Sequence, residues 1–303
     1  MTGAPRVAVI GDALIDELRD PSGARDFVGG AALNVAAGLA LRGVDATLIA
    51  MVGDDEPGDR IRAFLAEHGV TLIASESASG TARAVSDRSD GGEPRYAFND
   101  AAKTRHIAFD TRARRALDAA DLVVVSGFPF DDAGQARGLA EAVARPSARL
   151  VVDPNPRADL LRDRKAFLEG FERIAATALL VKVGDEDAHL LLDAPLSAFV
   201  KRLQRPGCGA AVLATAGAAG AEVHHGALAV RSGIVELPGP VVDTMGAGDA
   251  TLVAVVRSIA AHGIARTEAE WRDALREAME LAAVTVRHEG ALRRPPVVPQ
   301  LEV

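Results

Sequence analysis

The feature that most constrains this chain is the alternation of short apolar runs with longer segments of helical periodicity. The apolar runs lie at residues 6–10, 46–52, 122–126, 149–153, 179–183 and 210–215. Helical patterns between them lie at residues 34–42, 57–67 and 132–144. The runs are apolar at nearly every position, which is typical of parallel strands that are buried on both faces. The alternation therefore predicts an α/β fold in which a wound, mainly parallel sheet is flanked by helices.

Two segments break this alternation, at residues 12–28 and 75–100, and both are richer in Asp, Arg, Ser and Gly. In the second segment, TARAVSD and EPRYAF flank the sequence DGG at 90–92, which is a hairpin signal. Because these strands have no helices of their own, we expect a small β lid within a single domain of residues 1–303. The exposed edges of such a lid predict a homodimer that pairs through it.

Composition excludes several classes of protein. The 303 residues carry a net charge of −8, which argues against a nucleic-acid binder, since phosphate neutralisation needs clustered Lys and Arg. Cys208 is the only cysteine, so the chain has neither an internal disulfide nor a cysteine set for structural zinc. The first apolar stretch is too short for a secretion signal, and no 18-residue apolar run follows it. The sequence predicts a cytoplasmic protein with no membrane partner.

The string VVDTMGAGDATLVAVV at 241–256 carries the clearest chemical signal. Gly246, Ala247 and Gly248 are small enough to let backbone N–H groups approach a ligand closely. An almost wholly apolar helix follows, so its N-terminus is fixed in place. A helix N-terminus that follows glycines attracts anions, because its free N–H groups and its dipole point at the charge.

Asp249 lies in the first turn of that helix, beside the expected anion. A carboxylate next to a phosphate is explained if it accepts a hydroxyl proton while the N–H groups hold the phosphoryl oxygens. The alternative is that Asp249 only caps the helix. The sequence contains no Walker A string and no G-x-G-x-x-G after its first strand, which excludes a P-loop enzyme and disfavours a Rossmann oxidoreductase.

DTMGAGD resembles the C-terminal signature of the PfkB, or ribokinase-like, carbohydrate kinases. GGAALNVAAGLALRG at 29–43 and MVGDDEPGDRIRAFLAEHGV at 51–70 resemble the N-terminal signature, and GDALID stands before them. The order and spacing of these strings match the family over nearly the whole chain. The resemblance implies a ribokinase-like fold and transfer of the γ-phosphate of ATP to a sugar hydroxyl in a fructokinase-like enzyme. It also implies Mg²⁺, and K⁺ as a further cofactor.

The family pattern assigns roles around the glycine turn. Asp249 matches the general base, and Gly246, Ala247 and Gly248 match the anion hole that stabilises the transferring phosphoryl group. Asp243 matches an aspartate that helps to bind a monovalent cation through neighbouring carbonyls. The alternative for Asp243 is an aspartate in a turn at the end of a strand.

A second set of residues matches sugar-binding positions of the family. They are Asp12, Asp16, Gly29, Gly30, Asn34, Asn155 and Arg157. A carboxylate such as Asp16 can accept two hydroxyl donors at once, and an amide can both donate and accept. Arg157 could pair with a phosphate or with a substrate carboxylate. The alternatives are a turn cap for Asp12, a polar helix N-terminal residue for Asn34 and an ordinary surface arginine for Arg157.

A third set matches the nucleotide side of the family site. It consists of Lys182, Thr215, Gly217, Gly220 and Gly290. The chain departs from the family motif N-x-x-E, because Gly184 stands at the asparagine and Asp187 at the glutamate. Asp187 is a candidate for binding Mg²⁺ through water. Its alternative is an acid favoured by the helix dipole, and a plain β-turn is the alternative for Thr215 and Gly217.

Two other functions stay open on the sequence. One is a nucleoside kinase of the same superfamily, whose site would stack a base on aromatic rings; the lid offers Phe27, Tyr96 and Phe98 for this. The other is a sugar or nucleotide sensor without catalysis, since a fold alone never proves chemistry. The intact set from Gly246 to Asp249 argues against a sensor, because a sensor needs no base.

Overall fold

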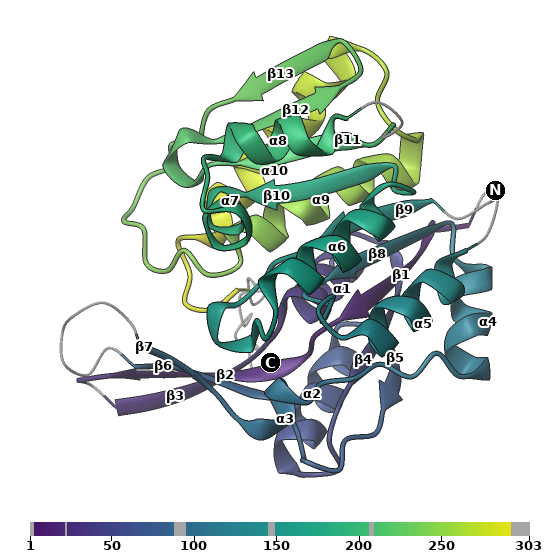
Figure 1. The fold of residues 1–303 in the computed structure, drawn as a ribbon. Helices are drawn as coiled ribbons and strands as arrows, with labels where there is room; N and C mark the ends of the chain where they lie inside the picture. Colours follow the sequence, from purple (N-terminus) through teal and green to yellow (C-terminus); the bar gives the residue numbers. More distant parts are fainter. Residues whose placement is uncertain (1–2, 22, 88–94, 145–148, 206–208, 292–303) are drawn as a thin grey trace.

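The larger sheet of the protein has nine strands in the order β13-β12-β11-β10-β9-β8-β1-β4-β5. We describe it in a computed structural model that covers residues 3–21, 23–87, 95–144, 149–205 and 209–291 (Figure 1). The strands are β1 (Arg6–Gly11), β4 (Asp45–Met51), β5 (Thr71–Ser75), β8 (Leu122–Ser126), β9 (Leu150–Asp153), β10 (Leu180–Gly184), β11 (Ala211–Thr215), β12 (Ala221–His225) and β13 (Leu228–Ser232). Every neighbouring pair from β11 to β5 is parallel, whereas β12 pairs antiparallel with both β11 and β13. The predicted wound, mainly parallel sheet is confirmed.

Helices cover both faces of this sheet. One face carries α1 (Ala31–Ala40), α2 (Glu56–Glu67), α9 (Ala247–His262) and α10 (Glu268–Thr285). The other carries α4 (Thr111–Ala119), α5 (Ala133–Val143), α6 (Arg164–Ala175), α7 (Asp185–Leu192) and α8 (Leu196–Leu203). None of the helices in the described ranges combines the length and the apolar character of a membrane span.

Successive residues of each strand pack on opposite faces of the sheet. In β1, Val7 and Val9 contact the α1 side, whereas Ala8 and Ile10 contact the α4 side. Both sets are buried, since helices cover both faces. This two-sided burial is why the strands appear in the sequence as continuous apolar runs.

A second sheet of four strands, in the order β3-β2-β6-β7, projects from the larger one (Figure 1). Its strands are β2 (Leu14–Asp20), β3 (Gly23–Gly29), β6 (Arg83–Asp87) and β7 (Arg95–Phe98), followed by the short helix α3 (Asp100–Lys103). Strands β6 and β7 are antiparallel, as the hairpin signal predicts, and the turn at 90–92 lies outside the described residues. The two segments expected to form a lid therefore join in one sheet. That this sheet closes over a ligand, and that residues 1–303 are a single domain, stay predictions.

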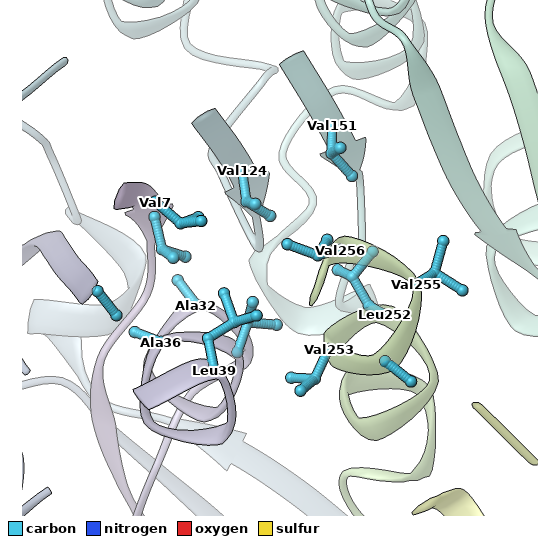
Figure 2. Packing of buried hydrophobic residues seen from close by; sticks show 14 of the residues in the cluster. Val7, Ala32, Ala36, Leu39, Val124, Val151, Leu252, Val253, Val255 and Val256 are labelled. Atoms are coloured by element: carbon cyan, nitrogen blue, oxygen red, sulfur yellow. The ribbon is translucent and has the colours of Figure 1, made fainter. Parts of the chain in front are cut away.

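The apolar helix α9 packs against α1 and against the central strands. Figure 2 shows side chains of α1, α9, β1, β8 and β9 pointing toward one another in this part of the core. The two helices approach so closely at Gly38 that a Cβ there would lie 2.8 Å from Cγ2 of Val253. Burial of α9 was expected from its composition, and the packing fixes where its N-terminus lies.

Candidate active site

The predicted site residues gather at the carboxyl edge of the larger sheet. Asp12 directly follows β1, Asp153 ends β9, and Arg157 lies just beyond it, before the 3₁₀ turn η1 (Ala158–Leu160). Lys182 lies in β10, the neighbour of β9 in the sheet. Wound α/β folds bind ligands at this edge of their parallel strands, and the topology places these side chains together there.

Asp249, in the first turn of α9, meets Asn34 of α1. Nδ2 of Asn34 donates a hydrogen bond of 2.8 Å to Oδ2 of Asp249, across 215 residues of sequence. The other amide atom of Asn34, Oδ1, is buried and accepts no hydrogen bond from any described residue. The structure thus joins the predicted base to a predicted sugar-binding residue.

The surroundings of Asp249 raise its affinity for a proton. Burial raises the pKa of this carboxyl to about 6, although the hydrogen bond from Asn34 lowers it. The negative charge of Asp153 raises the pKa further, while Lys182 and Arg157 lower it. A carboxylate with a pKa near the working pH suits a general base.

The turn before α9 leaves backbone donors free. Gly246 adopts a left-handed conformation with φ +78°, and a Cβ on it would lie 2.6 Å from backbone atoms of Ala291. The N–H groups of Gly248 and Asp249 donate to no acceptor among the described residues, as expected at a helix N-terminus. These donors stand beside the Asp249 carboxylate, where an anion hole for a phosphoryl group was predicted.

A buried ion pair lies beneath this turn. Nζ of Lys182 is 3.1 Å from Oδ1 of Asp153, and Oδ2 of Asp153 also accepts a hydrogen bond of 3.2 Å from Ser126. Burial lowers the pKa of Lys182, but the neighbouring carboxylates outweigh it and the net pKa is raised, so the ammonium is charged. A Cβ on Gly248 would lie 3.3 Å from Nζ. The sequence analysis named Lys182 but gave no role to Asp153 or Ser126, which lie at the ends of β9 and β8.

Asp16, which is predicted to bind the sugar, lies in β2. Its Oδ2 would be 2.1 Å from a Cβ on Gly29, so only glycine allows this carboxylate its position. Burial raises the pKa of Asp16 to about 7, and the charge of Arg157 opposes this shift. Gly30, with φ +108°, passes close to the carbonyl of Asp12, which explains the second glycine of the pair.

Asp12 caps α1. Its Oδ1 accepts a hydrogen bond of 3.1 Å from the N–H of Ala32, and its carbonyl accepts one of 3.2 Å from Leu33. This contact, across 20 residues of sequence, holds the start of α1 and is not the local turn cap given as the alternative. Asp12 also lines a pocket together with Arg105, a residue that the sequence analysis missed because it belongs to no motif.

Comparison with known proteins agrees with this geometry. The family model described as pfkB family carbohydrate kinase matches residues 5–297. The chain belongs to the pfkB family of carbohydrate kinases. A fructokinase of Klebsiella pneumoniae is 28% identical over 307 residues, which cover 98% of each protein. This pfkB kinase is therefore a sugar phosphotransferase, and a silent sensor is disfavoured.

Solved structures share the fold of this pfkB kinase. A fructokinase from Vibrio cholerae O395, crystallised with fructose, ADP and calcium, superimposes with a TM-score of 0.78 at 21% identity, over 95% of this chain and 94% of that one. An aminoimidazole riboside kinase from Salmonella enterica, in complex with aminoimidazole riboside and an ATP analogue, gives a TM-score of 0.76 at 22% identity, over 94% and 95%. At these identities the likeness establishes the ribokinase-like fold.

The carboxylate of Asp187 in this pfkB kinase is engaged locally. Its Oδ2 accepts a hydrogen bond of 2.6 Å from the N–H of Gly184, at the start of α7. Burial raises the pKa of Asp187 to about 6, and the charge of Lys182 opposes the shift. The helix-cap alternative is thus supported. The described residues include no group of three or more acidic, His or Cys side chains placed to hold a metal ion.

Asp243 ties two loops together. Its Oδ1 accepts a hydrogen bond of 3.0 Å from the N–H of Met245, and its Oδ2 accepts one of 3.3 Å from Gly290. Gly290 has φ +78°, and a Cβ on it would lie 3.2 Å from the ring of Phe27 in the lid. The predicted cation aspartate and the predicted nucleotide-side glycine are therefore neighbours.

The remaining predicted residues lie at the ends of β9 and β11. Asn155 has φ +37°, a left-handed conformation that Asn tolerates better than most residues. Thr215 ends β11 with its Oγ1 near Gly184, and Gly217 opens the 3₁₀ turn η2 (Gly217–Ala219). A Cβ on Gly220 would lie 2.2 Å from the carbonyl of Ser232, which gives this glycine a structural reason as well.

Proposed function

We propose that this protein transfers the γ-phosphoryl group of ATP to a hydroxyl of a monosaccharide, with Asp249 as the general base. The sugar oxygen attacks the γ-phosphorus and forms the new O–P bond as its proton passes to the Asp249 carboxylate. The bond from the γ-phosphorus to the bridging oxygen breaks, and ADP leaves. Phosphoryl transfer needs little more than positioning and charge stabilisation, which this site offers.

The observation that carries the proposal is the group around the N-terminus of α9. Free N–H groups of Gly248 and Asp249, a buried ammonium at Lys182 and a carboxylate with a raised pKa lie within one turn of helix and its neighbours. The donors stabilise charge that develops on the phosphoryl oxygens, while the carboxylate takes the proton. No other part of the described chain combines these elements.

Each substrate has its own side of the cleft in this proposal. Asp16 and Asn34 bind the sugar, whose skeleton we take as ketohexose-like because of the fructokinase relatives. Lys182 and the turn after Thr215 face the nucleotide, and Mg²⁺ enters with ATP as part of that substrate. K⁺ binding near Asp243, a cytoplasmic location, a homodimer through the lid and the absence of a nucleic-acid partner stay predictions.

A nucleoside kinase remains the second candidate. The aminoimidazole riboside kinase of the same fold is the observation that favours it. Phe27, which lies close to Gly290, and Phe98 are aromatic residues of the lid strands β3 and β7. Protection against thermal unfolding by adenosine but not by fructose would favour this candidate, since a ligand at 100 times its dissociation constant adds about 2.7 kcal/mol of stability.

The test of the base is an Asp249→Asn variant in an assay of ADP release coupled to sugar phosphorylation. We expect kcat to fall about 10²- to 10⁴-fold, the usual effect of removing a general base. Asp185→Asn is the matched control, because Asp185 lies in the first turn of α7 but is exposed. Turnover by Asp249→Asn at the level of this control would contradict the assignment.

A further inference from the structure

Strand β3 of the lid meets the segment that follows α10. Nη1 of Arg25 donates a hydrogen bond of 2.7 Å to Oε1 of Glu289, across 264 residues of sequence. Two residues further along β3, Phe27 lies close to Gly290, since a Cβ on this glycine would be 3.2 Å from Cδ1 of the ring. Arg25 and Phe27 are on the same face of β3, because alternate residues of a strand share a face. One face of the lid therefore contacts residues 289–290 through a charged side chain and an apolar one.

Arg25 is also held from within the lid. Its Nη2 donates a hydrogen bond of 2.5 Å to Oδ2 of Asp20, at the end of the neighbouring strand β2. The planar fork of a guanidinium can serve two carboxylates in this way. The hydrogen bond with Glu289 is the main reason why the pKa of Arg25 is raised. Asp20 thus orients the guanidinium inside the lid, and Glu289 joins it to a segment outside the lid.

The same face of the lid carries the carboxylate that is proposed to bind the sugar. Asp16 of β2 is the partner of Phe27 in the pairing of β2 with β3. Residues that are directly opposite each other in such a pair have their side chains on one face of the sheet. Besides burial, the negative charges of Asp12 and Asp249 raise the pKa of Asp16, so this carboxyl lies within the field of the proposed base. A shift of the lid relative to residues 289–290 would therefore also move Asp16 relative to Asp249.

On its other side, the segment after α10 contacts the turn before α9. The N–H of Gly290 donates a hydrogen bond of 3.3 Å to Oδ2 of Asp243, and Oδ1 of Asp243 accepts one of 3.0 Å from the N–H of Met245. Ala291 approaches Gly246 so closely that a Cβ on Gly246 would lie 2.6 Å from its backbone. Residues 289–291 therefore link the lid to the turn that is proposed to bind the transferring phosphoryl group.

We propose that Arg25 and Glu289 are a positioning pair that couples the two substrate sites of this kinase. The inference rests on the proposed function and deepens it. A nucleotide that binds at the turn around Gly246 also stabilises residues 289–291, and the ion pair transmits this to the lid strands. Nucleotide binding therefore favours the lid position in which Asp16 lies near Asp249. Because coupling between two binding sites is reciprocal, a bound sugar strengthens nucleotide binding by the same factor.

The exposure of the pair allows its effect on coupling to be separated from an effect on folding. The side chains of Arg25 and Glu289 are 40% and 48% exposed. Ion pairs this exposed contribute little to the stability of a protein, so variants of either residue should fold normally. Salt screens an exposed ion pair, whereas it does not weaken the apolar contact of Phe27 with Gly290. The proposal therefore predicts a coupling that weakens as the ionic strength rises.

The experiment measures amide hydrogen exchange of the full chain at low salt, with and without the non-hydrolysable ATP analogue adenylyl imidodiphosphate and Mg²⁺. This readout needs no knowledge of which sugar the enzyme phosphorylates. We expect the saturating analogue to slow exchange in the first turn of α9, where it is proposed to bind. We also expect it to slow exchange in β2 and β3 about 5- to 10-fold, at the lower end of usual coupling between sites.

The same measurement is then made on variants of the pair. Glu289→Gln should reduce the slowing in β2 and β3 to about 2-fold or less while the first turn of α9 stays protected. Arg25→Gln should do the same, and the double variant should lose no more than either single variant, because both changes remove one interaction. About 0.5 M NaCl should act on the wild-type protein as Glu289→Gln does. Glu280→Gln is the matched control, since Glu280 is an exposed glutamate of α10 and its loss removes the same charge.

The outcomes separate this inference from the proposed function. If the analogue protects α9 but leaves exchange in β2 and β3 unchanged, or if Glu289→Gln leaves the slowing there intact, the coupling is overturned and the kinase function stands. Faster exchange in the variant by the same factor with and without the analogue would show a purely structural role and also overturns the coupling. If the analogue does not bind to the wild-type protein at all, the ATP-dependent function itself fails and the inference falls with it.

Discussion

Asp249 lies between groups that pull its pKa in opposite directions, and this makes its proton affinity measurable through the rate. Burial raises its pKa to about 6, while the hydrogen bond from Asn34 lowers it. A base must be ionised to act, so kcat/KM should rise with pH through about 6 and then level off. A profile of kcat/KM against pH checks this expectation, measured with a slowly phosphorylated sugar that does not itself ionise in this pH range.

Asn34→Ala tests the same contact. Without the donated hydrogen bond the carboxylate loses the interaction that favours its charged form, so the acidic limb should move to higher pH. The loss relative to wild type should be small well above the new pKa, grow as pH falls through about 6, and become constant below both pKa values. A uniform loss at all pH values, with the limb unmoved, would show that Asn34 acts only on the sugar.

Variants of Lys182 can separate its contribution to stability from a contribution to phosphoryl transfer. Lys182→Met leaves the Asp153 carboxylate buried without its partner, which should cost about 3–5 kcal/mol of unfolding free energy. In the double variant Lys182→Met/Asp153→Asn both charges are gone, so we expect most of the stability to return. Activity should stay low in both, because the ammonium beside Gly248 is missing. Urea unfolding and ADP release measure the two effects, and recovery of full activity in the double variant would exclude a role for Lys182 in transfer.

For single residues, the sequence predicted which ones belong to the candidate site better than it predicted their contacts. Asp249 and Asn34 both stand in recognisable strings, but no local signal could pair two residues 215 positions apart. Asp187 was recognised as either a metal ligand or a cap, and only the 2.6 Å bond from Gly184 favours the cap. Arg105 was missed because its position is created by the pocket and not by any motif.

Among the elements, burial decided which ones the sequence could predict. The central strands, such as β8 and β9, are apolar throughout and were located to within a residue or two. Strands β12 and β13, at one end of the sheet, carry polar residues such as His224 and Arg231 and have a helix on one side only, so they do not appear among the predicted apolar runs. Helix α2 begins one residue before the predicted start, because Asp55 caps it by accepting from the N–H of Gly58.

The contact between α1 and α9 gives a prediction for an element as a whole. Gly38→Ala places a Cβ 2.8 Å from Cγ2 of Val253, and because α9 carries Asp249, pushing this helix away disturbs the site. Overpacking costs about 1–3 kcal/mol, against a gain of about 1 kcal/mol in helix propensity. We expect a lower melting temperature and a lower kcat. Adding Val253→Ala removes the clash and should restore both; failure to restore kcat would mean that the helix position does not limit catalysis.

For the molecule as a whole, the buried carboxyl groups of the candidate site lower the free energy of unfolding by an amount that depends on pH. The folded pKa of Asp249, about 6, lies above the unfolded value of 3.8. Such a group favours folding below the unfolded pKa, and this contribution is lost as pH rises through the folded pKa. Asp16, at about 7, acts in the same direction. The ligand-free protein should therefore lose stability between about pH 4 and pH 7 from these two groups.

Asp249→Asn isolates one of the two contributions. The variant should unfold at higher denaturant concentration than wild type at pH 8, by up to about 3 kcal/mol, since each pKa unit corresponds to 1.36 kcal/mol. At pH 4 the wild-type carboxyl is protonated in the folded protein, and the two proteins should be equally stable. Urea titrations at both pH values measure the difference. An increase in the free energy of unfolding that is the same at both pH values would indicate an effect of packing instead of charge.

The hydrogen bond between Asn34 and Asp249 has a consequence for the protein while it is being made. Ribosomes release the lid strands and Asp16 first, whereas Asp249 emerges only with the last fifth of the 303 residues. In the proposed mechanism, a polypeptide that stops before α9 lacks the group that takes up the proton, so it should not phosphorylate a sugar.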